Sequence, residues 1–409
     1  MGLSLFLGAC ATPTPPIKVV PTPVQIEPVA EPVIDPKLEA SYQDQLRALI
    51  MEVSKAQSIP LENLESGLRD SKNLSQIKKL VAPPPVTFQK NWRVYRSRFV
   101  EPVRIKAGMT FIEQNRQALE AAEQESGVPY QVIAAIIGVE TIYGRQMGTF
   151  RVKDVLTSLA FDYPEAPNRV ARQTLFRDQL KDLVVLCWRE SNRKQESFNR
   201  CLNQSSSYAG AIGLPQFMPG SILQFAKDGD GDGIIDLRKS NRDAIFSVAN
   251  FLKVHGWQAG MPIYFPAIVN EQTHSKIVEL ADGQPLAKHT VAQFIHLGIL
   301  DSNQGDLLKG GVEPDSKALI IDLPSPGKGQ EPEVEYVVGL TNFLSIVNYN
   351  RSYFYAQSVA EFAQALGYSN KSAFPAGELG SQKPAKEQQR AKKQDKKIKK
   401  VKKAEKPTN

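Results

Sequence analysis

One glutamate stands at the end of an apolar run, where its chemistry would be altered. In residues 131–144, QVIAAIIGVETIYG, helical spacing puts three isoleucines on the turns just before Glu140. These are Ile133, Ile136 and Ile137. A carboxyl group beside packed hydrocarbon keeps its proton, because burial disfavours the charged form, and a protonated glutamic acid can donate to a glycosidic oxygen. The alternative, a solvated residue at a helix end, fits this pattern better when it is taken alone.

A second stretch combines small residues with two polar side chains. Positions 209–211 and 213 hold only alanine and glycine, so a saccharide can approach the backbone closely. Ser207 and Gln216 offer hydroxyl and amide groups as partners for sugar hydroxyl and acetamido groups. We also expect Gly138 and Gly144 to leave room for a polymer beside the glutamate. A glycine-rich loop that only connects two helices is the alternative.

A third motif has the residue types of a calcium loop. In residues 228–236, DGDGDGIID, carboxylates stand at loop positions 1, 3 and 5 and a glycine at position 6. The expected ligands are Asp228, Asp230, Asp232 and the backbone carbonyl of Ile234. Position 12, where an EF-hand has a bidentate glutamate, is Lys239, so this EF-hand-like loop is not a standard hand. We favour a structural Ca²⁺ over a solvated acidic turn.

The elements that would position these motifs are mainly helical. Apolar periodicity predicts helices over 35–79, 110–126, 130–140, 167–189, 221–227, 243–255 and 359–366. Between residues 261 and 345 the runs MPIYFPAIV, KALIIDLP and EVEYVVGL predict strands, with one short helix in KHTVAQFIHLGIL. The fold class is therefore mainly α (α+β), with a small β-containing insertion in a helical body.

Composition limits the possible classes of protein. The 409 residues, 42% hydrophobic and 23% charged, are typical of two or three globular units. No apolar run approaches the roughly 20 residues of a membrane-spanning helix, which excludes a polytopic membrane protein. The net charge is +7, but residues 383–409 hold twelve basic and three acidic residues, so the rest of the chain carries −2. The body is therefore no candidate nucleic-acid binder.

Both ends of the chain indicate export and attachment. Residues 1–9 followed by Cys10, GLSLFLGAC, resemble a bacterial lipoprotein signal, in which the cysteine becomes lipidated. Residues 10–37 are rich in proline and form an extended spacer. A chance cysteine and a plain disordered N-terminus are the alternatives. The Lys-rich tail, within residues 374–409, suits anionic lipid or an anionic wall polymer, although a merely solvated tail fits equally well.

Two further cysteines, Cys187 and Cys201, remain as an even pair. In an oxidising compartment they can form a disulfide, whereas two reduced, buried cysteines are the alternative.

The motifs, taken in order, resemble one enzyme family. GVETIYGRQMG at 138–148, SSYAGAIGLPQFMPGSI at 206–222 and VANFLKVHGW at 248–257 resemble the lytic murein transglycosylase B family, and the resemblance spans about residues 95–355. It implies an exported bacterial lipoprotein on the periplasmic face of the outer membrane, with a lysozyme-like fold, that cleaves peptidoglycan glycan strands. We expect a monomeric body over 38–373, with its core at about 110–260.

The resemblance also assigns residues. Glu140 matches the single catalytic acid/base, and Asp243 matches a late ligand of the calcium loop. The substrate-binding matches are Tyr95, Ser207, Gln216, Met218, Tyr349, Asn350 and Tyr355. One departure is Phe251, where relatives can carry a tyrosine, so a hydroxyl contact to substrate is lost.

The implied mechanism needs one carboxyl group. A hydrolase commonly uses two carboxyl groups. Possible second carboxyl groups are Asp154, Asp162 and Glu190, but no motif in the sequence points to any of them. In the family's reaction one glutamic acid protonates the oxygen between N-acetylmuramic acid and N-acetylglucosamine, then deprotonates the muramyl 6-hydroxyl, which closes a 1,6-anhydro ring. A hydrolytic muramidase and a non-catalytic peptidoglycan-binding lipoprotein remain the alternatives.

Overall fold

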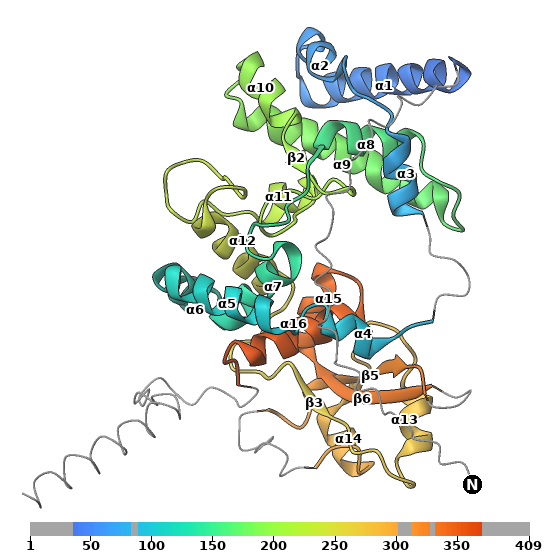
Figure 1. Ribbon diagram of the computed structural model, residues 1–409, viewed down its shortest axis with the longest axis vertical. Helices are drawn as coiled ribbons and strands as arrows, with labels where there is room; N and C mark the ends of the chain where they lie inside the picture. Colours follow the sequence, from blue (N-terminus) through green and yellow to red (C-terminus); the bar gives the residue numbers. More distant parts are fainter. Residues whose placement is uncertain (1–35, 83–88, 302–311, 328–331, 370–409) are drawn as a thin grey trace, which may run out of the picture.

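The computed structural model describes residues 36–82, 89–301, 312–327 and 332–369. Cys10, the proline-rich spacer and the Lys-rich tail therefore lie outside the described residues. The predicted fold class, mainly α with a small β-containing part, is confirmed. Figure 1 shows an elongated molecule, with a helical part at one end of the long axis and a small sheet at the other. In the described ranges no helix combines the length and the apolar character needed to cross a membrane.

The N-terminal helical region is three helices, whereas the sequence pattern predicted one continuous stretch over 35–79. The helices are α1 (Pro36–Gln57), α2 (Leu61–Leu68) and α3 (Ser75–Val81). The first break falls at Ser58, which has a left-handed φ of 53°, followed closely by Pro60. The apolar period continues across the break, because helices on both sides bury side chains in the same core.

The central helices carry the catalytic and loop motifs. They are α5 (Pro102–Gln114), α6 (Arg116–Ser126), α7 (Tyr130–Thr141), α8 (Val152–Phe161), α9 (Arg169–Glu190), α10 (Gln195–Leu202), α11 (Pro219–Phe225) and α12 (Asn241–Val254). The helix predicted at 110–126 is interrupted at Asn115. Gly127 ends α6 in the left-handed conformation, with φ 74°, which glycine adopts without steric cost. The residues Gly127, Val128 and Pro129 therefore form the turn from α6 into α7.

Three helices lie between the helical part and the sheet in Figure 1. They are α4 (Trp92–Ser97), α15 (Thr341–Tyr349) and α16 (Tyr353–Ala365). Three ion pairs connect α4 to its surroundings: Arg93 pairs with Glu333 at 2.7 Å and with Glu335 at 3.9 Å, and Arg96 pairs with Glu361 of α16. These helices bring the late part of the chain against α7.

The sheet is antiparallel with the strand order β3-β6-β5-β4. Its strands are β3 (Tyr264–Pro266), β4 (His289–Thr290), β5 (Lys317–Ser325) and β6 (Glu333–Leu340), and two short helices accompany it, α13 (His274–Leu280) and α14 (Val291–His296). Ile320 of β5 pairs with Val338 of β6. Each of the three predicted β runs thus contains a strand of this sheet, although in MPIYFPAIV the strand is only Tyr264–Pro266.

Strand β5 faces two hydrophobic cores. Leu319, Ile321 and Leu323 belong to the large core of the helical body. Ala318 and Ile320 belong to a smaller core under α13 and α14. Since successive side chains of a strand point to opposite faces, β5 joins the two cores directly.

One disulfide and one ion pair connect elements of the helical part. Cys187 of α9 and Cys201 of α10 form a disulfide, which the sequence had left open against two reduced cysteines. Lys153 of α8 is fully buried, and its ammonium pairs with Asp70 at 2.5 Å. Although partial burial favours the protonated acid, hydrogen bonds and charges from Lys153 and Arg151 hold the pKa of Asp70 down at about 2.

Candidate active site

Glu140 lies one residue before the end of α7. The predicted isoleucines Ile133, Ile136 and Ile137 are fully buried, while Glu140 itself is partly exposed. Its Oε1 accepts a hydrogen bond of 2.6 Å from the Tyr355 hydroxyl. Burial raises the pKa of Glu140 to about 7, and the hydrogen bond from the tyrosine opposes that rise in part. The group can therefore hold or release a proton near neutral pH.

Tyr355 and Tyr349 reach this carboxyl group from the C-terminal helices. Tyr355 is buried on α16, and its ring stacks on that of Tyr349, with centroids 6.3 Å apart. The Tyr349 hydroxyl donates to the Pro215 carbonyl oxygen at 2.5 Å. Burial first, and then the charge of Glu140, raise the pKa of both hydroxyls well above the ordinary value of 10. Both tyrosines therefore act as neutral donors.

Tyr95 approaches from α4. Its ring packs on Phe99 and on Phe354, with centroid distances of 5.1 and 5.5 Å. Burial first, and then the charge of Glu140, raise the pKa of Tyr95 above the ordinary value. Three predicted tyrosines, from α4 and from the consecutive helices α15 and α16, thus lie in the surroundings of one carboxyl group.

The loop between β2 and α11 holds the predicted polar residues. The short ribbon of β1 (Phe150–Arg151) and β2 (Ser205–Ser206) leads into it. The Ser207 Oγ accepts from the amides of Ala209 and Ala211, at 3.3 and 3.1 Å, so this side chain shapes the loop.

Gln216 has a left-handed φ of 50°, and its amide nitrogen donates to the Gly213 carbonyl at 2.8 Å. A positive φ at a residue other than glycine costs energy and is concentrated at functional sites. The side-chain oxygen of Gln216 accepts no hydrogen bond from the described residues, so it can accept one from a ligand. Met218 follows as the N-cap residue of α11 and is partly buried, and Asn350 is exposed after α15.

The glycines of these motifs have a different role from the predicted one. A Cβ at Gly138 would lie 2.7 Å from the Phe362 ring and would clash with the Tyr143 hydroxyl, so this glycine admits protein side chains. A Cβ at Gly210 would lie 2.5 Å from Leu156, and one at Gly213 would lie 2.5 Å from the Leu237 carbonyl oxygen. At these three glycines the expected approach of a polymer to the backbone is wrong, because they face the interior, whereas Gly144 is partly exposed and a Cβ there would meet nothing closer than Leu214, at 3.8 Å.

Two polar residues that the sequence did not single out, the buried Thr141 and the partly buried Arg104, hold the segment around Glu140. The Thr141 Oγ1 lies 3.0 Å from the Leu214 carbonyl oxygen and accepts from the Gly144 amide at 3.0 Å. It therefore ties the end of α7 to the loop that carries Gln216. Arg104 of α5 donates to the Gly138 carbonyl at 2.5 Å, which also accepts from the Ile142 amide at the end of α7. No motif marks Arg104, since its partner is a backbone atom.

Phe251 packs within the same aromatic group. Its ring lies 4.8 Å from that of Tyr349 and 5.6 Å from that of Phe217, centroid to centroid. Phe251 is buried, so the position at which relatives can carry a tyrosine presents only a hydrocarbon ring in this chain.

Two of the three candidate second carboxylates are engaged in ion pairs. Asp154 pairs with Arg151 at 2.7 Å, and Asp162 pairs with Lys78 at 2.6 Å. Burial and the charge of Asp236 raise the pKa of Glu190 to about 7. The causes of the Glu140 shift are burial and Tyr355, and none of these acids is among them.

The acidic loop brings together three of its predicted ligands. Carboxylate oxygens of Asp228, Asp230 and Asp232 lie within 4.8 Å of one another. Asp243 does not belong to this cluster: it is buried on α12, where it accepts from the amides of Gly229 at 2.9 Å and Asp236 at 2.7 Å. Three clustered carboxylates suit a hard cation with oxygen ligands, so the residues fit Ca²⁺.

Known proteins share this chain's sequence and fold. The family model described as "Transglycosylase SLT domain" matches residues 41–364. Membrane-bound lytic murein transglycosylase B of Escherichia coli (strain K12) is 34% identical over 316 residues, which are 75% of this chain and 78% of that protein.

Two solved structures are similar along most of the chain. Soluble lytic transglycosylase SltB1 from Pseudomonas aeruginosa is 32% identical, with a TM-score of 0.66, covering 79% of this chain and 98% of that one. Escherichia coli Slt35, solved in complex with calcium, is 31% identical, with a TM-score of 0.61, covering 78% of this chain and 92% of that one.

Proposed function

The chain belongs to the transglycosylase SLT family and is a peptidoglycan lytic transglycosylase, and on that premise we propose that Glu140 alone performs both proton transfers of its reaction. The lysozyme-like fold expected from the motifs is confirmed by the solved relatives. The assignment of both transfers to one residue rests on the burial of Glu140 and on its contact with Tyr355.

In the first step protonated Glu140 donates its proton to the oxygen of the β-1,4 bond between N-acetylmuramic acid and N-acetylglucosamine. The C1–O bond breaks, and N-acetylglucosamine leaves with the proton. The substrate's acetamido group stabilises the positive charge that develops at C1. In the second step the Glu140 carboxylate takes the proton of the muramyl 6-hydroxyl, whose oxygen bonds to C1. The product is a 1,6-anhydro end, and no water is consumed.

The observation that carries this proposal is the state of Glu140. A group that must act first as acid and then as base works best when its pKa lies near the operating pH, and that of Glu140 is about 7. The Tyr355 hydroxyl, 2.6 Å away, stabilises the carboxylate that exists between the two steps. Two of the second carboxylates considered for a hydrolase, Asp154 and Asp162, are paired with cations, which supports the anhydro reaction over hydrolysis.

The remaining predicted residues are proposed to bind the glycan. Ser207 and Gln216 would take hydroxyl and acetamido groups, and Met218 would contact a sugar face. Tyr95, Tyr349 and Asn350 would complete the site. The Gln216 carbonyl oxygen and the partly exposed Met218 support this assignment.

Digestion of purified peptidoglycan tests the mechanism. We expect the wild-type protein to release muropeptides with anhydro ends, each one water lighter by mass spectrometry than a reducing end. Glu140→Gln should bind sacculi and release nothing, while Glu113→Gln, at an exposed glutamate of α5, should behave as wild type. Reducing ends would indicate a hydrolytic muramidase. Binding without any soluble product from the wild type would indicate a non-catalytic wall-binding lipoprotein.

Calcium is proposed as a structural ion at the cluster of Asp228, Asp230 and Asp232, with the Ile234 carbonyl as a further ligand. Asp243 would either hold the loop by accepting hydrogen bonds from the loop's backbone amides or act as a further ligand of the ion. The ion would stabilise the loop between α11 and α12. Titration of the chelator-treated protein should show one Ca²⁺ bound with a rise in melting temperature, and Asp230→Asn should reduce both.

Attachment to the envelope is proposed through lipidation of Cys10, since the E. coli relative is described as membrane-bound. The wild-type protein should label with palmitate in cells and fractionate with membranes. Cys10→Ala should abolish both, and a version lacking residues 383–409 should show whether the tail adds affinity for anionic lipid. We also propose the predicted domain boundaries and a monomeric state. Sedimentation of the soluble Cys10→Ala protein tests the monomeric state.

A further inference from the structure

The residue after Glu140 is a threonine whose hydroxyl is used entirely inside the protein. Thr141 is fully buried, and its Oγ1 accepts from the Gly144 amide at 3.0 Å. Its acceptors are the carbonyl oxygens of Leu214, at 3.0 Å, and of Ile137, at 3.2 Å. The contact with Ile137 lies within α7 and is common for a threonine in a helix. The contact with Leu214 crosses to a segment 73 residues further along the chain and therefore joins two parts of the site.

The segment that this hydroxyl reaches is a tight turn. Ile212 and Phe217 pair across its base, with N···O distances of 2.8 and 3.1 Å. At its end Gln216 has a left-handed φ of 50°, and both its backbone amide and its side-chain amide donate to the Gly213 carbonyl, at 3.2 and 2.8 Å. These bonds make the turn a small rigid unit, so a bond to Leu214 in its middle also fixes Gln216.

The chain leaves α7 in a conformation that needs support. Ile142, Tyr143 and Gly144 all have left-handed φ values, of 50°, 56° and 87°. This region is unfavourable for a residue with a side chain, and most of all for a β-branched residue such as isoleucine. Thr141 accepts from the amides of Gly144, through Oγ1, and of Gln146, through its carbonyl oxygen, at 3.0 and 2.9 Å. One residue therefore holds the end of α7, the strained turn after it and the second turn opposite.

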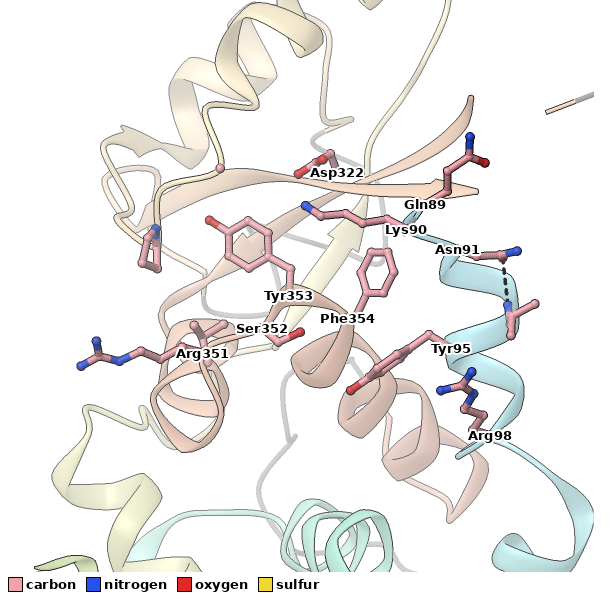
Figure 2. A pocket seen from close by; sticks show the side chains of 14 residues that line it. Gln89, Lys90, Asn91, Tyr95, Arg98, Asp322, Arg351, Ser352, Tyr353 and Phe354 are labelled. Atoms are coloured by element: carbon pink, nitrogen blue, oxygen red, sulfur yellow. Dashed lines mark hydrogen bonds between the residues drawn. The ribbon is translucent and has the colours of Figure 1, made fainter. Parts of the chain in front are cut away.

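The carboxyl group of Glu140 is fixed separately, by α16. Figure 2 shows the first turn of this helix against α4, with Phe354 next to Tyr95. The following residue, Tyr355, is buried and donates to the Oε1 of Glu140 at 2.6 Å. This contact does not include the turn of Gln216, so the position of that turn relative to the carboxyl group depends on other bonds.

Two side chains connect the turn of Gln216 to the surroundings of Glu140. One is Thr141, the covalent neighbour of Glu140, through its bond to the turn. The other is Tyr349 of α15, whose hydroxyl donates to the Pro215 carbonyl at 2.5 Å. Because Tyr349 keeps part of the geometry, loss of the Thr141 hydroxyl should weaken the reaction without abolishing it.

We propose that Thr141 is a positioning residue of the transglycosylase reaction, whose hydroxyl sets the distance between the Glu140 carboxyl group and a sugar held by Gln216. This inference rests on the proposed roles of those two residues. Proton transfer to a glycosidic oxygen requires the acid within hydrogen-bond reach, and a misplacement of about 1 Å can cost about 100-fold in rate. A residue that does not touch substrate can therefore control kcat.

The test uses three variants of Thr141 and a matched control. Thr141→Val removes the hydroxyl at nearly constant volume, Thr141→Ala removes it without placing a methyl group against the Leu214 carbonyl, and Thr141→Ser keeps it. The control is Thr157→Val on α8. Thr157 is also fully buried, but its hydroxyl bonds to carbonyl oxygens of its own helix, those of Lys153 and Asp154. Cleavage rates on purified peptidoglycan and urea unfolding are measured for each protein.

We expect Thr141→Val and Thr141→Ala to lower kcat by about 10- to 100-fold and to change KM by less than about threefold. Thr141→Ser should stay within about threefold of the wild-type kcat, because the hydroxyl is restored. Thr157→Val should match the wild type in kcat while losing a similar amount of stability, since it also lacks a buried hydroxyl.

A double-mutant cycle tests whether Thr141 acts through Gln216. Gln216→Asn shortens the side chain that holds the sugar, and asparagine tolerates the left-handed backbone. In that protein Thr141→Val should lower kcat by less than about threefold further, because the contact that it positions is already lost.

The inference is overturned by a wild-type kcat in both hydroxyl-free variants, by an equal loss in Thr157→Val or Thr141→Ser, or by a fully additive loss in the Gln216→Asn protein. Failure of both hydroxyl-free variants to fold would also overturn it, since the hydroxyl would then serve the fold alone. A Glu140→Gln protein that keeps wild-type activity would instead refute the proposed function, whatever the Thr141 variants do.

Discussion

The state of Glu140 predicts that this carboxyl group lowers the stability of the protein at neutral and alkaline pH. Burial raises its pKa from 4.5 to about 7. Between those pH values the folded protein keeps a proton that the unfolded chain releases, so the free energy of unfolding falls as pH rises. A difference from 4.5 to about 7 corresponds to about 3 kcal/mol, an upper limit because the side chain is partly exposed.

Glutamine cannot ionise, so Glu140→Gln should escape this loss. We expect the variant to exceed the wild type in free energy of unfolding by less than about 1 kcal/mol at pH 4.5 and by up to about 3 kcal/mol at pH 8. Urea unfolding of both proteins, followed by tryptophan fluorescence from pH 4.5 to 8.5, measures the difference. Glu113→Gln, an exposed position on α5, serves as the control. A difference that is constant with pH, or a variant less stable than the wild type at pH 8, would refute the reasoning.

Other contacts give three further predictions. Tyr355→Phe removes the hydrogen bond that favours the Glu140 carboxylate, so the alkaline limb of the kcat/KM profile should move up by about 1–2 pH units, and an unmoved limb would contradict the assignment. Asp70→Asn removes the negative charge that pairs with buried Lys153, and should lower the free energy of unfolding by about 1–2 kcal/mol at pH 7. This magnitude is reduced because Asp70 is exposed. The difference between the two proteins should shrink as pH falls toward 2, where Asp70 of the wild type becomes protonated. Reduction with dithiothreitol should lower the free energy of unfolding by about 3 kcal/mol in the wild type and have no effect on Cys187→Ala.

The environment of Glu140 was predictable because it is local. An apolar run with helical period places hydrocarbon one turn away from the last residues of the same helix, and Ile133, Ile136 and Ile137 are indeed fully buried. The acidic loop was predictable for a similar reason, since its three aspartates are neighbours in sequence.

The roles of the glycines were not predictable, because they depend on residues far along the chain. Gly138 is small to admit Phe362, and Gly210 is small to admit Leu156. A glycine-rich motif shows that something approaches closely, and the sequence does not say whether that is a ligand or the protein itself.

The tyrosines around Glu140 were assigned by resemblance alone. Tyr95, Tyr349 and Tyr355 come from three helices, and nothing in their spacing distinguishes them from aromatic residues of an ordinary core. The helix over 341–349 escaped prediction for a related reason: a buried strand runs directly into it, and the continuous apolar pattern hides the change of period.

Strand β5 has a mechanical consequence for the whole molecule. Its odd-numbered side chains seal the helical body, and its even-numbered ones seal the core under α13 and α14. Opening either core to water would expose one face of β5, which also covers the other core. The β-containing segment therefore cannot unfold independently of the helical body. Calorimetry of the intact protein should accordingly give a single heat-absorption peak, in which the sheet and the catalytic helices come apart together.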